Sequence, residues 1–207
     1  MPTEREVWDT IADSWTNVRV KPEKEVIDFS RKINSGPILD VGCGSCRNSL
    51  PFLERNIKCF GLDFSKGMIR EAKIFLRRRE LKMNFVIADM TNIPFKSKSF
   101  LAIIFVRALP HLETRKKRLE CLGEVKRVGI KTIISCWYRW DRRLFWISLK
   151  SLFSNDVYID WKYHGKIYKR FHHLYTKKEL EEDIKKVRFK IEKIWVGGGN
   201  IWSLVNV

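Results

Sequence analysis

The chain has 207 residues, of which 44% are hydrophobic, a size and composition that suit one α/β domain and exclude a disordered polymer. Lysine and arginine number 41 against 24 acidic residues, so the formal net charge is +17. Such a charge favours polyanionic partners, nucleic acid first and an acidic membrane surface second. A thermophile surface rich in Lys and Arg is the alternative, although glutamate normally rises with them there.

The N-terminus MPTEREVWDT is polar and charged, unlike a signal peptide. No apolar run approaches the roughly 20 residues that span a bilayer, so we expect no membrane segment and a cytoplasmic location. Cys43 and Cys46 form a lone CxxC motif without a second pair of ligands, so no metal site is predicted. A redox or disulfide role for this pair is the weaker alternative.

Thr3 and Glu6 fit a capping box that opens a helix with Trp8 and Trp15 on its apolar face. A second helix is predicted after Pro22. Apolar strands then alternate with helices, one from Ser65 and one around ETRKKRLECLGEVKRV. This alternation predicts a parallel sheet covered on both faces. The predicted strands are PILDV, KCFGLD, NFVIAD, LAIIFV and KTIISCW.

Residues 138–173 differ from this pattern because they are dense in aromatic and basic side chains, and RRLFWISLKSLF within them has helical spacing. We expect a substrate-recognition insertion here. Thr176 and Glu179 fit another capping box, and FKIEKIWV and NIWSLVNV, joined by three glycines, predict a closing hairpin. The chain is therefore predicted to be one domain over 1–207. Its fold class is α/β, a Rossmann-like, seven-stranded, mostly parallel sheet with helices on both faces and a C-terminal antiparallel hairpin.

A glycine turn after the first strand is the first part of a predicted cofactor-binding site. Asp40, Gly42 and Gly44 lie in this turn, where glycine lets the backbone approach a ligand closely. Asp63 ends the second strand, 19 residues after Gly44, where a carboxylate can accept both ribose hydroxyls of a nucleotide-like cofactor. Asp89 and Met90 end the third strand, where they can hold an adenine ring. The alternative is that Asp63 and Asp89 only cap the helices that follow.

The same turn distinguishes two cofactors. A dinucleotide fingerprint requires a third glycine where Arg47 stands. Acidic side chains at three strand ends suit a cationic adenosyl ligand, and S-adenosylmethionine carries a sulfonium and an ammonium group but no pyrophosphate. We therefore predict S-adenosylmethionine as the cofactor.

At this point the chain resembles the class I methyltransferases and, more narrowly, the tRNA wobble-uridine carboxymethyl methyltransferases. Three segments carry the narrow resemblance: VWDTIADSWTNVRVKP, RALPHLETRKKRLECLGEV and YKRFHHLYTKKELEEDI. IISCWYRWD is similar to the family's fifth strand. Three departures concern substrate specificity more than the cofactor: Cys46 replaces the usual third glycine, Leu101 a common acid, and Arg107 and Pro110 replace small or histidine residues.

The resemblance implies esterification of 5-carboxymethyluridine in tRNA, aided in related enzymes by a small zinc-binding activator protein. Arg19 and Lys21 match the T-R-x-K-P segment near the cofactor and substrate, with a solvated pair as the alternative. Arg170 and His173 are expected to contact the wobble nucleotide. His111 is expected to orient the acceptor, although a structural hydrogen bond is an equal alternative. Arg107 is grouped with the cofactor contacts, whereas His172 is expected at the surface.

An acceptor carboxylate is ionised at neutral pH and requires no general base, so catalysis rests on positioning and partial desolvation. Trp137, Tyr138, Trp140, Trp161 and Tyr163 could stack on anticodon bases, but most are expected in the core. The basic runs at 77–79 and 115–118 could contact phosphates, or form ordinary solvated helix faces. Two other functions remain open: methylation of a small molecule or protein side chain, and non-catalytic RNA binding.

Overall fold

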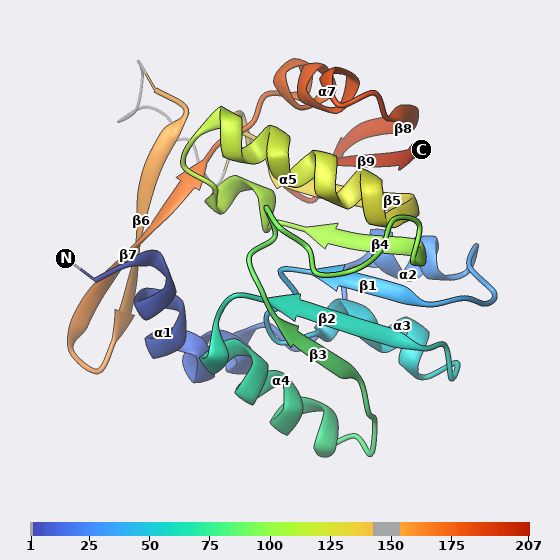
Figure 1. Ribbon diagram of the computed structural model, residues 1–207. Helices are drawn as coiled ribbons and strands as arrows, with labels where there is room; N and C mark the ends of the chain where they lie inside the picture. The colour runs from blue at the N-terminus through green and yellow to red at the C-terminus, as the bar shows by residue number, and fades with distance from the viewer. Residues whose placement is uncertain (1, 143–153) are drawn as a thin grey trace.

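The computed structural model describes residues 2–142 and 154–207 and is built on a seven-stranded sheet of order β3-β2-β1-β4-β5-β9-β8 (Figure 1). The first five strands pair in parallel, and β9 pairs antiparallel with both β5 and β8. The predicted mostly parallel sheet with a C-terminal antiparallel hairpin is confirmed. The strands are β1 (Ile38–Val41), β2 (Cys59–Asp63), β3 (Asn84–Ile87), β4 (Phe100–Val106), β5 (Gly129–Trp137), β8 (Lys190–Gly197) and β9 (Asn200–Asn206).

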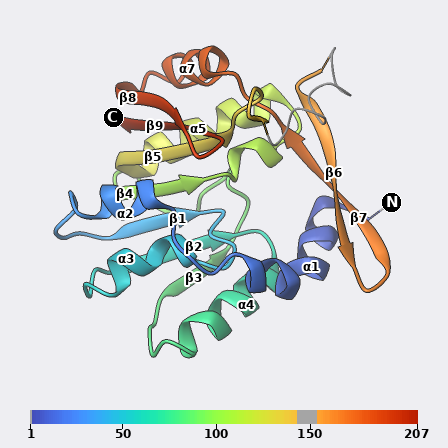
Figure 2. The ribbon, with the colours of Figure 1, turned by 180° about the vertical axis from the view of Figure 1, so that it is seen from behind.

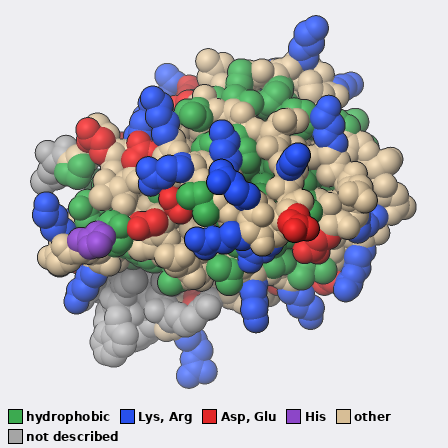
Figure 3. Space-filling view, turned by 90° about the horizontal axis from the view of Figure 1, so that it is seen from below, with side chains coloured by type: hydrophobic (Ala, Val, Ile, Leu, Met, Phe, Trp, Pro, Cys, Tyr) green, Lys and Arg blue, Asp and Glu red, His purple; other side chains and the backbone are tan. Residues whose placement is uncertain are grey.

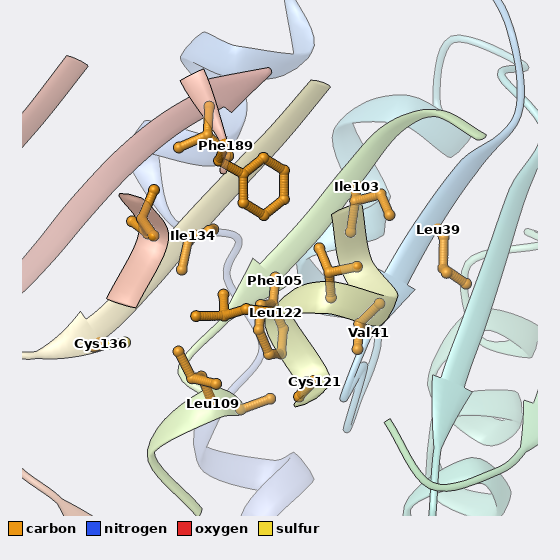
Figure 4. Close-up of a cluster of buried hydrophobic side chains, with 14 of the residues drawn as sticks. Leu39, Val41, Ile103, Phe105, Leu109, Cys121, Leu122, Ile134, Cys136 and Phe189 are labelled. Carbon is orange, nitrogen blue, oxygen red and sulfur yellow. The ribbon is translucent and has the colours of Figure 1, made fainter. Parts of the chain in front are cut away.

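Helices cover both faces of this sheet (Figures 1 and 2). Because successive strand residues point to opposite faces, each strand supplies two separate cores. On one face, Ile38, Ile104 and Trp202 pack beneath α2 (Lys24–Ser30), α3 (Leu50–Leu53) and α4 (Lys66–Arg77). On the other face, a cluster that includes Leu39 and Phe105 packs beneath α5 (Arg115–Val128) and α7 (Lys177–Lys186), as Figure 4 shows.

Two further elements stand at the carboxyl edge of the sheet. The helix α1 (Glu4–Val18) packs against α4, and it also contacts a separate two-stranded antiparallel sheet formed by β6 (Asp156–Tyr163) and β7 (Lys166–His173). Figure 1 shows this hairpin beside the N-terminal helix, on the side to which the parallel strands point. The strand β7 also contacts the short turn of helix η2 (Leu109–His111) that follows β4.

The hairpin was not predicted, because the aromatic and basic density of 138–173 indicated only an insertion. Trp161 and Tyr163 of β6 attach it to α1: the Trp161 indole N–H donates to the Ser14 hydroxyl at 2.9 Å, and the Tyr163 hydroxyl donates to Asp13 at 2.6 Å. The segment RRLFWISLKSLF, predicted as helical, lies outside the described residues except for its first arginine.

One of the two predicted capping boxes is complete. Thr3 and Glu6 satisfy each other's backbone N–H groups at the start of α1, as predicted. At α7 the prediction was wrong in part: the Thr176 hydroxyl accepts from the Glu179 N–H, but the Glu179 carboxylate binds His173 and Asn155 instead of returning to the cap.

One face of the surface carries many basic side chains. On the face seen from below, lysine and arginine side chains are spread widely and acidic ones are fewer (Figure 3). None of the helices in the described part of the chain is both long and apolar enough to cross a bilayer.

Candidate functional site

A cavity of about 400 Å³ lies along the carboxyl edge of the sheet. Parallel α/β sheets bind ligands at this edge, beside the point where the strand order reverses, here between β1 and β4. One half of the cavity is formed by the turns after β1, β2 and β3. We call this the cofactor half, and its lining includes Asp40, Gly42, Gly44, Asp63, Asp89 and Met90.

The other half lies over the ends of β4 and β5, beneath α1 and β7. We call it the acceptor half, and its lining includes Glu4, Trp8, Trp15, Arg19, Arg107, His111, Trp137 and His172. Its walls are mostly aromatic, and its residues come from both ends of the sequence. Nine of the twelve residues predicted for the site therefore line one cavity, and the three that do not are Lys21, Arg170 and His173.

The glycine turn has the conformation that its residues require. Gly42 has φ of +63°, and a Cβ atom there would lie 2.4 Å from the Cβ of Ala108, so only glycine fits beneath the turn after β4. Cys46 stands at the position where related sequences have a third glycine, and its φ is 55°. The left-handed conformation explains the usual glycine, and Cys46 adopts it with its thiol fully buried. Cys43 and Cys46 are free, buried thiols.

Two buried carboxylates lie beneath the cofactor half. Asp63 accepts hydrogen bonds from the N–H of Gly44 at 2.9 Å and from the N–H of Ser65 at 3.0 Å, while Asp40 accepts one from the Ser49 hydroxyl at 2.8 Å. Burial raises the pKa of Asp40 to about 8 and that of Asp63 to about 6. These acids fit a cationic ligand, because a nearby positive charge would offset the cost of burying them.

Asp89 lies at the end of β3 and is exposed beside Met90. Its carboxylate accepts from the N–H and the hydroxyl of Thr91, both at 2.8 Å. Asp63 likewise accepts from Ser65, so each of these acids stabilises the turn after its strand. Neither acid is a helix cap, which was the alternative to ligand binding: Ser65 is the N-cap of α4, and no helix lies in the fully described segment between Asp89 and β4. Both acids also line the cavity.

The segment that joins α1 to α2 crosses over the glycine turn, and we call residues 19–23 the strap. Three contacts hold it: the Ser45 hydroxyl donates to the carbonyl of Arg19 at 3.0 Å, Arg47 donates to the carbonyl of Lys21, and the N–H of Glu23 donates to Asn48 at 3.0 Å. The strap places the Arg19 side chain in the cavity, above Trp15 at 4.9 Å. Lys21 contributes its carbonyl group, and its side chain is exposed outside the cavity.

Glu23 links the strap to the sheet. Its Oε1 atom accepts from Arg47 at 2.5 Å and also from Arg107, so one carboxylate bridges two guanidinium groups. Arg107 follows β4 with φ of 59° and donates its N–H to the carbonyl of Ser135 at 2.9 Å. Burial lowers the pKa of Arg107 to about 10, partly opposed by Glu23. Sequence reasoning missed Glu23, because its partners are 24 and 84 residues away.

Four aromatic rings in successive contact form a wall of the acceptor half. The ring of Trp8 lies 4.9 Å from that of His111, which lies 4.5 Å from His172, and His172 stacks on Trp137 at 4.1 Å and 13°. Burial lowers the pKa of His111 to about 4 and that of His172 well below its usual value, so both are neutral at pH 7. The surface location expected for His172 was wrong, since it is 2% exposed.

Arg170 and His173 lie behind this wall. The Arg170 guanidinium sits among Trp8, Trp15 and Trp161, at 5.5, 5.0 and 5.0 Å from their rings, and so joins β7 to α1. Both ring nitrogens of His173 are engaged, one with Asp156 at 2.6 Å and the other with Glu179 at 2.7 Å. Strand alternation turns His172 towards the cavity and His173 away from it. His173 therefore has a structural position in this fold.

The predicted basic runs separate into different environments. Arg77 is the last residue of α4, and the first turn of this helix lines the cavity through Met68, so about 14 Å of helix at 1.5 Å per residue lies between Arg77 and the site. In the run 115–118, Arg115 pairs with Asp183 at 2.8 Å and Arg118 is buried, whereas Lys117 lines the cavity. The predicted stacking residues divide similarly: Trp137 lines the cavity, and Trp140 is 63% exposed.

Comparison with known proteins agrees with this geometry. Residues 38–129 match the protein family described as "Methyltransferase domain". The tRNA (carboxymethyluridine(34)-5-O)-methyltransferase of Saccharomyces cerevisiae is 31% identical over 135 residues, which are 63% of this chain and 46% of that protein. The demethylmenaquinone methyltransferase of Renibacterium salmoninarum is 29% identical over 110 residues, 53% of this chain and 45% of that protein. The chain thus spans less than half the length of these curated relatives.

Solved structures share the fold over most of the chain. A SAM-dependent methyltransferase of Methanosarcina mazei superposes with a TM-score of 0.73 at 21% identity, over 84% of this chain and 92% of that one. The chain solved in complex with the Trm112 methyltransferase activator of Haloferax volcanii superposes with a TM-score of 0.72 at 13% identity, over 99% of this chain and 97% of that one.

The chain contains a class I methyltransferase domain, with S-adenosylmethionine as its cofactor. Within that class it resembles the tRNA carboxymethyluridine methyltransferases, as the sequence predicted.

The buried acids predict that cofactor affinity depends on pH. A bound cation favours ionised Asp40 and Asp63, so binding lowers their pKa values from about 8 and about 6 and releases protons. Affinity should therefore rise between pH 6 and pH 8, by up to about tenfold per pH unit for each proton released, and level off above that range. Titration calorimetry in buffers of different ionisation enthalpy measures both quantities. The same affinity at pH 6 and pH 8.5 would contradict the prediction.

Proposed function

We propose that the protein transfers a methyl group from S-adenosylmethionine to tRNA, forming the methyl ester of 5-carboxymethyluridine at the wobble position. The separation of charge within the cavity is the observation that carries this proposal. The buried acids Asp40 and Asp63 lie beneath the cofactor half. The acceptor half contains two arginines, Arg19 and the Glu23-paired Arg107, against the single acid Glu4 among the residues assigned to it. This arrangement suits a cationic methyl donor facing an anionic acceptor.

Methyl transfer to a carboxylate requires the protein mainly to position the donor and the acceptor. When bound, S-adenosylmethionine supplies an electrophilic methyl group, and a carboxylate acceptor is already ionised at pH 7. Arg19 would orient the acceptor by charge-assisted hydrogen bonds, while the aromatic wall of Trp8 and Trp137 excludes water. The neutral histidines His111 and His172 add no positive charge that would pair with the acceptor and weaken its attack.

Three further features support tRNA as the substrate. The net charge of +17 favours a polyanion, and basic side chains are spread over the surface in Figure 3. The yeast protein that is 31% identical is a tRNA methyltransferase, and the three segments that resemble its family run through most of the chain. We further propose that residues 1–207 act as one domain, because α1 and the β6–β7 hairpin complete the acceptor half built on the sheet.

A methyltransferase activator is the protein partner we propose. The chain from Haloferax volcanii, which shares this fold along its whole length, was solved in complex with the Trm112 activator. The sheet has two edges at which a partner could add a strand, β3 and β8, and Ile87 of β3 is 48% exposed.

A small-molecule acceptor is the second candidate. The curated relative at 29% identity is a demethylmenaquinone methyltransferase, and an aromatic wall can also receive a quinone ring. Such an enzyme would have no use for the excess of positive charge.

The deciding experiment is transfer of labelled methyl from S-adenosylmethionine to bulk tRNA, with and without an activator protein, followed by digestion to nucleosides. An alkali-labile methyl ester on a wobble uridine is the expected product. Label on another nucleoside would retain tRNA as the substrate and discard the carboxylate acceptor. If tRNA stays unlabelled in both conditions while the cofactor binds, the proposal is wrong and a small-molecule acceptor should be tested.

Replacement of Arg19 with alanine should reduce turnover without loss of the fold. The strap is held through the carbonyl of Arg19, so the backbone contact with Ser45 survives when the side chain is removed. Loss of a charge-assisted contact of about 1.5–3 kcal/mol predicts a 10- to 150-fold lower kcat/KM for tRNA. Single-turnover methyl transfer measures this effect, with cofactor affinity and thermal unfolding as controls. Turnover equal to that of the unaltered protein would exclude Arg19 from the site.

A further inference from the structure

The acceptor half contains buried polar atoms that have no hydrogen-bond partner among the described residues, and two of them belong to side chains that differ in their hydrogen-bonding chemistry. These two atoms are Oε2 of Glu4 and Nδ1 of His172, and both are shielded from solvent. His172 is 2% exposed, and its ring forms part of the cavity wall. Because an unsatisfied buried polar atom destabilises a protein, the two atoms in this binding cavity indicate a ligand that satisfies both.

The backbone of Phe171 and the ring of His111 connect these two side chains, which line the same half of the cavity. The N–H of Phe171 donates to Oε1 of Glu4 at 2.9 Å, and its carbonyl group lies 2.9 Å from Nδ1 of His111, whose ring contacts that of His172. Glu4 belongs to α1 and Phe171 to β7, so the site is assembled from elements 167 residues apart. Trp137 stacks on His172 at 4.1 Å, which fixes the plane of its ring.

Their chemistry is complementary. When Glu4 is ionised, its carboxylate oxygens accept hydrogen bonds and donate none. A neutral histidine, in contrast, donates one hydrogen bond from either of its two ring nitrogens. An acceptor and a donor that line the same half of the cavity match a ring edge on which an N–H group adjoins a carbonyl group. The imide edge of uracil has this pattern, and cytosine lacks it, because its N3 atom is an acceptor.

We propose that Glu4 and His172 determine base specificity: Glu4 accepts the N3–H of a uracil ring, and His172 donates to an adjacent carbonyl oxygen. This inference rests on the proposed function and adds to it the residues that select uridine over cytidine. The aromatic wall supplies stacking, which tolerates any base, so the discrimination comes from these two polar contacts.

The variant Glu4→Gln tests the proposal with almost no change of shape. The N–H of Phe171 keeps the glutamine carbonyl oxygen in the place of Oε1, so the amide nitrogen takes the place of Oε2. An acceptor in the cavity thereby becomes a donor. This donor opposes the N3–H of uracil but matches the bare N3 of cytosine.

The substrates are two anticodon stem-loops that are identical except for the wobble base, 5-carboxymethyluridine or 5-carboxymethylcytidine. The unaltered protein should favour the uridine substrate in kcat/KM by roughly 100-fold or more. Glu4→Gln should reduce this ratio at least ~10-fold, with unchanged cofactor affinity and unfolding temperature. His172→Phe, which preserves stacking on Trp137, should lower kcat/KM for the uridine substrate about tenfold. Glu54→Gln removes an exposed glutamate at the C-cap of α3 and is the matched control, with no expected change.

The outcomes separate this inference from the function it rests on. If the unaltered protein methylates neither stem-loop, the proposed function fails. If it methylates the uridine substrate and Glu4→Gln retains the full ratio, the function stands and base reading by Glu4 is wrong. If the ratio falls only because the variant is unfolded, its unfolding temperature will show this, and Glu4→Asp should then restore selectivity if the carboxylate reads the base.

Discussion

Replacing Asp63 with alanine should abolish binding of S-adenosylmethionine. The Asp63 carboxylate lines the cofactor half, and at the same time it accepts the N–H groups of Gly44 and Ser65, so it holds the glycine turn against the start of α4. Its removal takes away a ligand contact and leaves two backbone donors without a partner. Loss of two to three charge-assisted hydrogen bonds at about 1.5–3 kcal/mol each predicts at least a 100-fold weaker affinity.

Titration calorimetry with S-adenosylmethionine measures this effect, and thermal unfolding shows whether the domain persists. Asp28→Ala provides a matched control, because Asp28 lies on α2 outside the cavity and its side chain is about half exposed. Near-normal affinity in a folded Asp63→Ala protein would refute the cofactor assignment.

Replacing Glu23 with alanine should have the largest effect on stability. Its carboxylate bridges Arg47 and Arg107, whose side chains are 13% and 18% exposed, so its loss leaves two mostly buried cations facing each other. Removal of one partner from a buried ion pair costs about 3 kcal/mol or more. The strap also loses its connection to the end of β4, so cofactor affinity should fall together with stability.

Urea unfolding measures the change in the free energy of unfolding, and Glu54→Ala, at the exposed C-cap position of α3, supplies the comparison. The double variant Glu23→Ala, Arg107→Met should recover part of the loss, because it removes one of the two unpaired cations. A change in Glu23→Ala below about 1 kcal/mol would mean that the two guanidinium groups are compensated by solvent instead.

The parallel half of the fold could be predicted because its signals are local. The strands β1, β2 and β4 are buried on both faces and are therefore continuous apolar runs, and each ends near a glycine or a polar turn. The hairpin β6–β7 was missed although β6 carries a strand pattern, with Val157, Ile159 and Trp161 at alternate positions. Its partner β7 has the sequence KIYKRFHH, in which no alternation marks the buried side.

The cofactor half of the site could be predicted for the same reason, whereas the acceptor half could not. Asp40, Gly42, Gly44 and Asp63 lie near one another in sequence and follow strands, so their approach in space follows from the parallel sheet. The acceptor half depends on contacts between distant elements, such as Glu4 with Phe171. No local pattern encodes these pairs. The choice between His172 and His173 required knowledge of which side of β7 faces the cavity.

The distance in sequence between Glu4 and Phe171 also has a consequence for the order of folding. The helix α1 is synthesised 167 residues before the backbone N–H that its glutamate binds, whereas β1 through β5 can pair as they emerge. Contacts of such long range form late, because loop closure must precede them. We therefore expect the sheet to assemble first, with the acceptor half completed only when the hairpin docks on α1. In hydrogen exchange, the amides of α1 and the hairpin should accordingly open together at a lower free energy than those of β1 and β4.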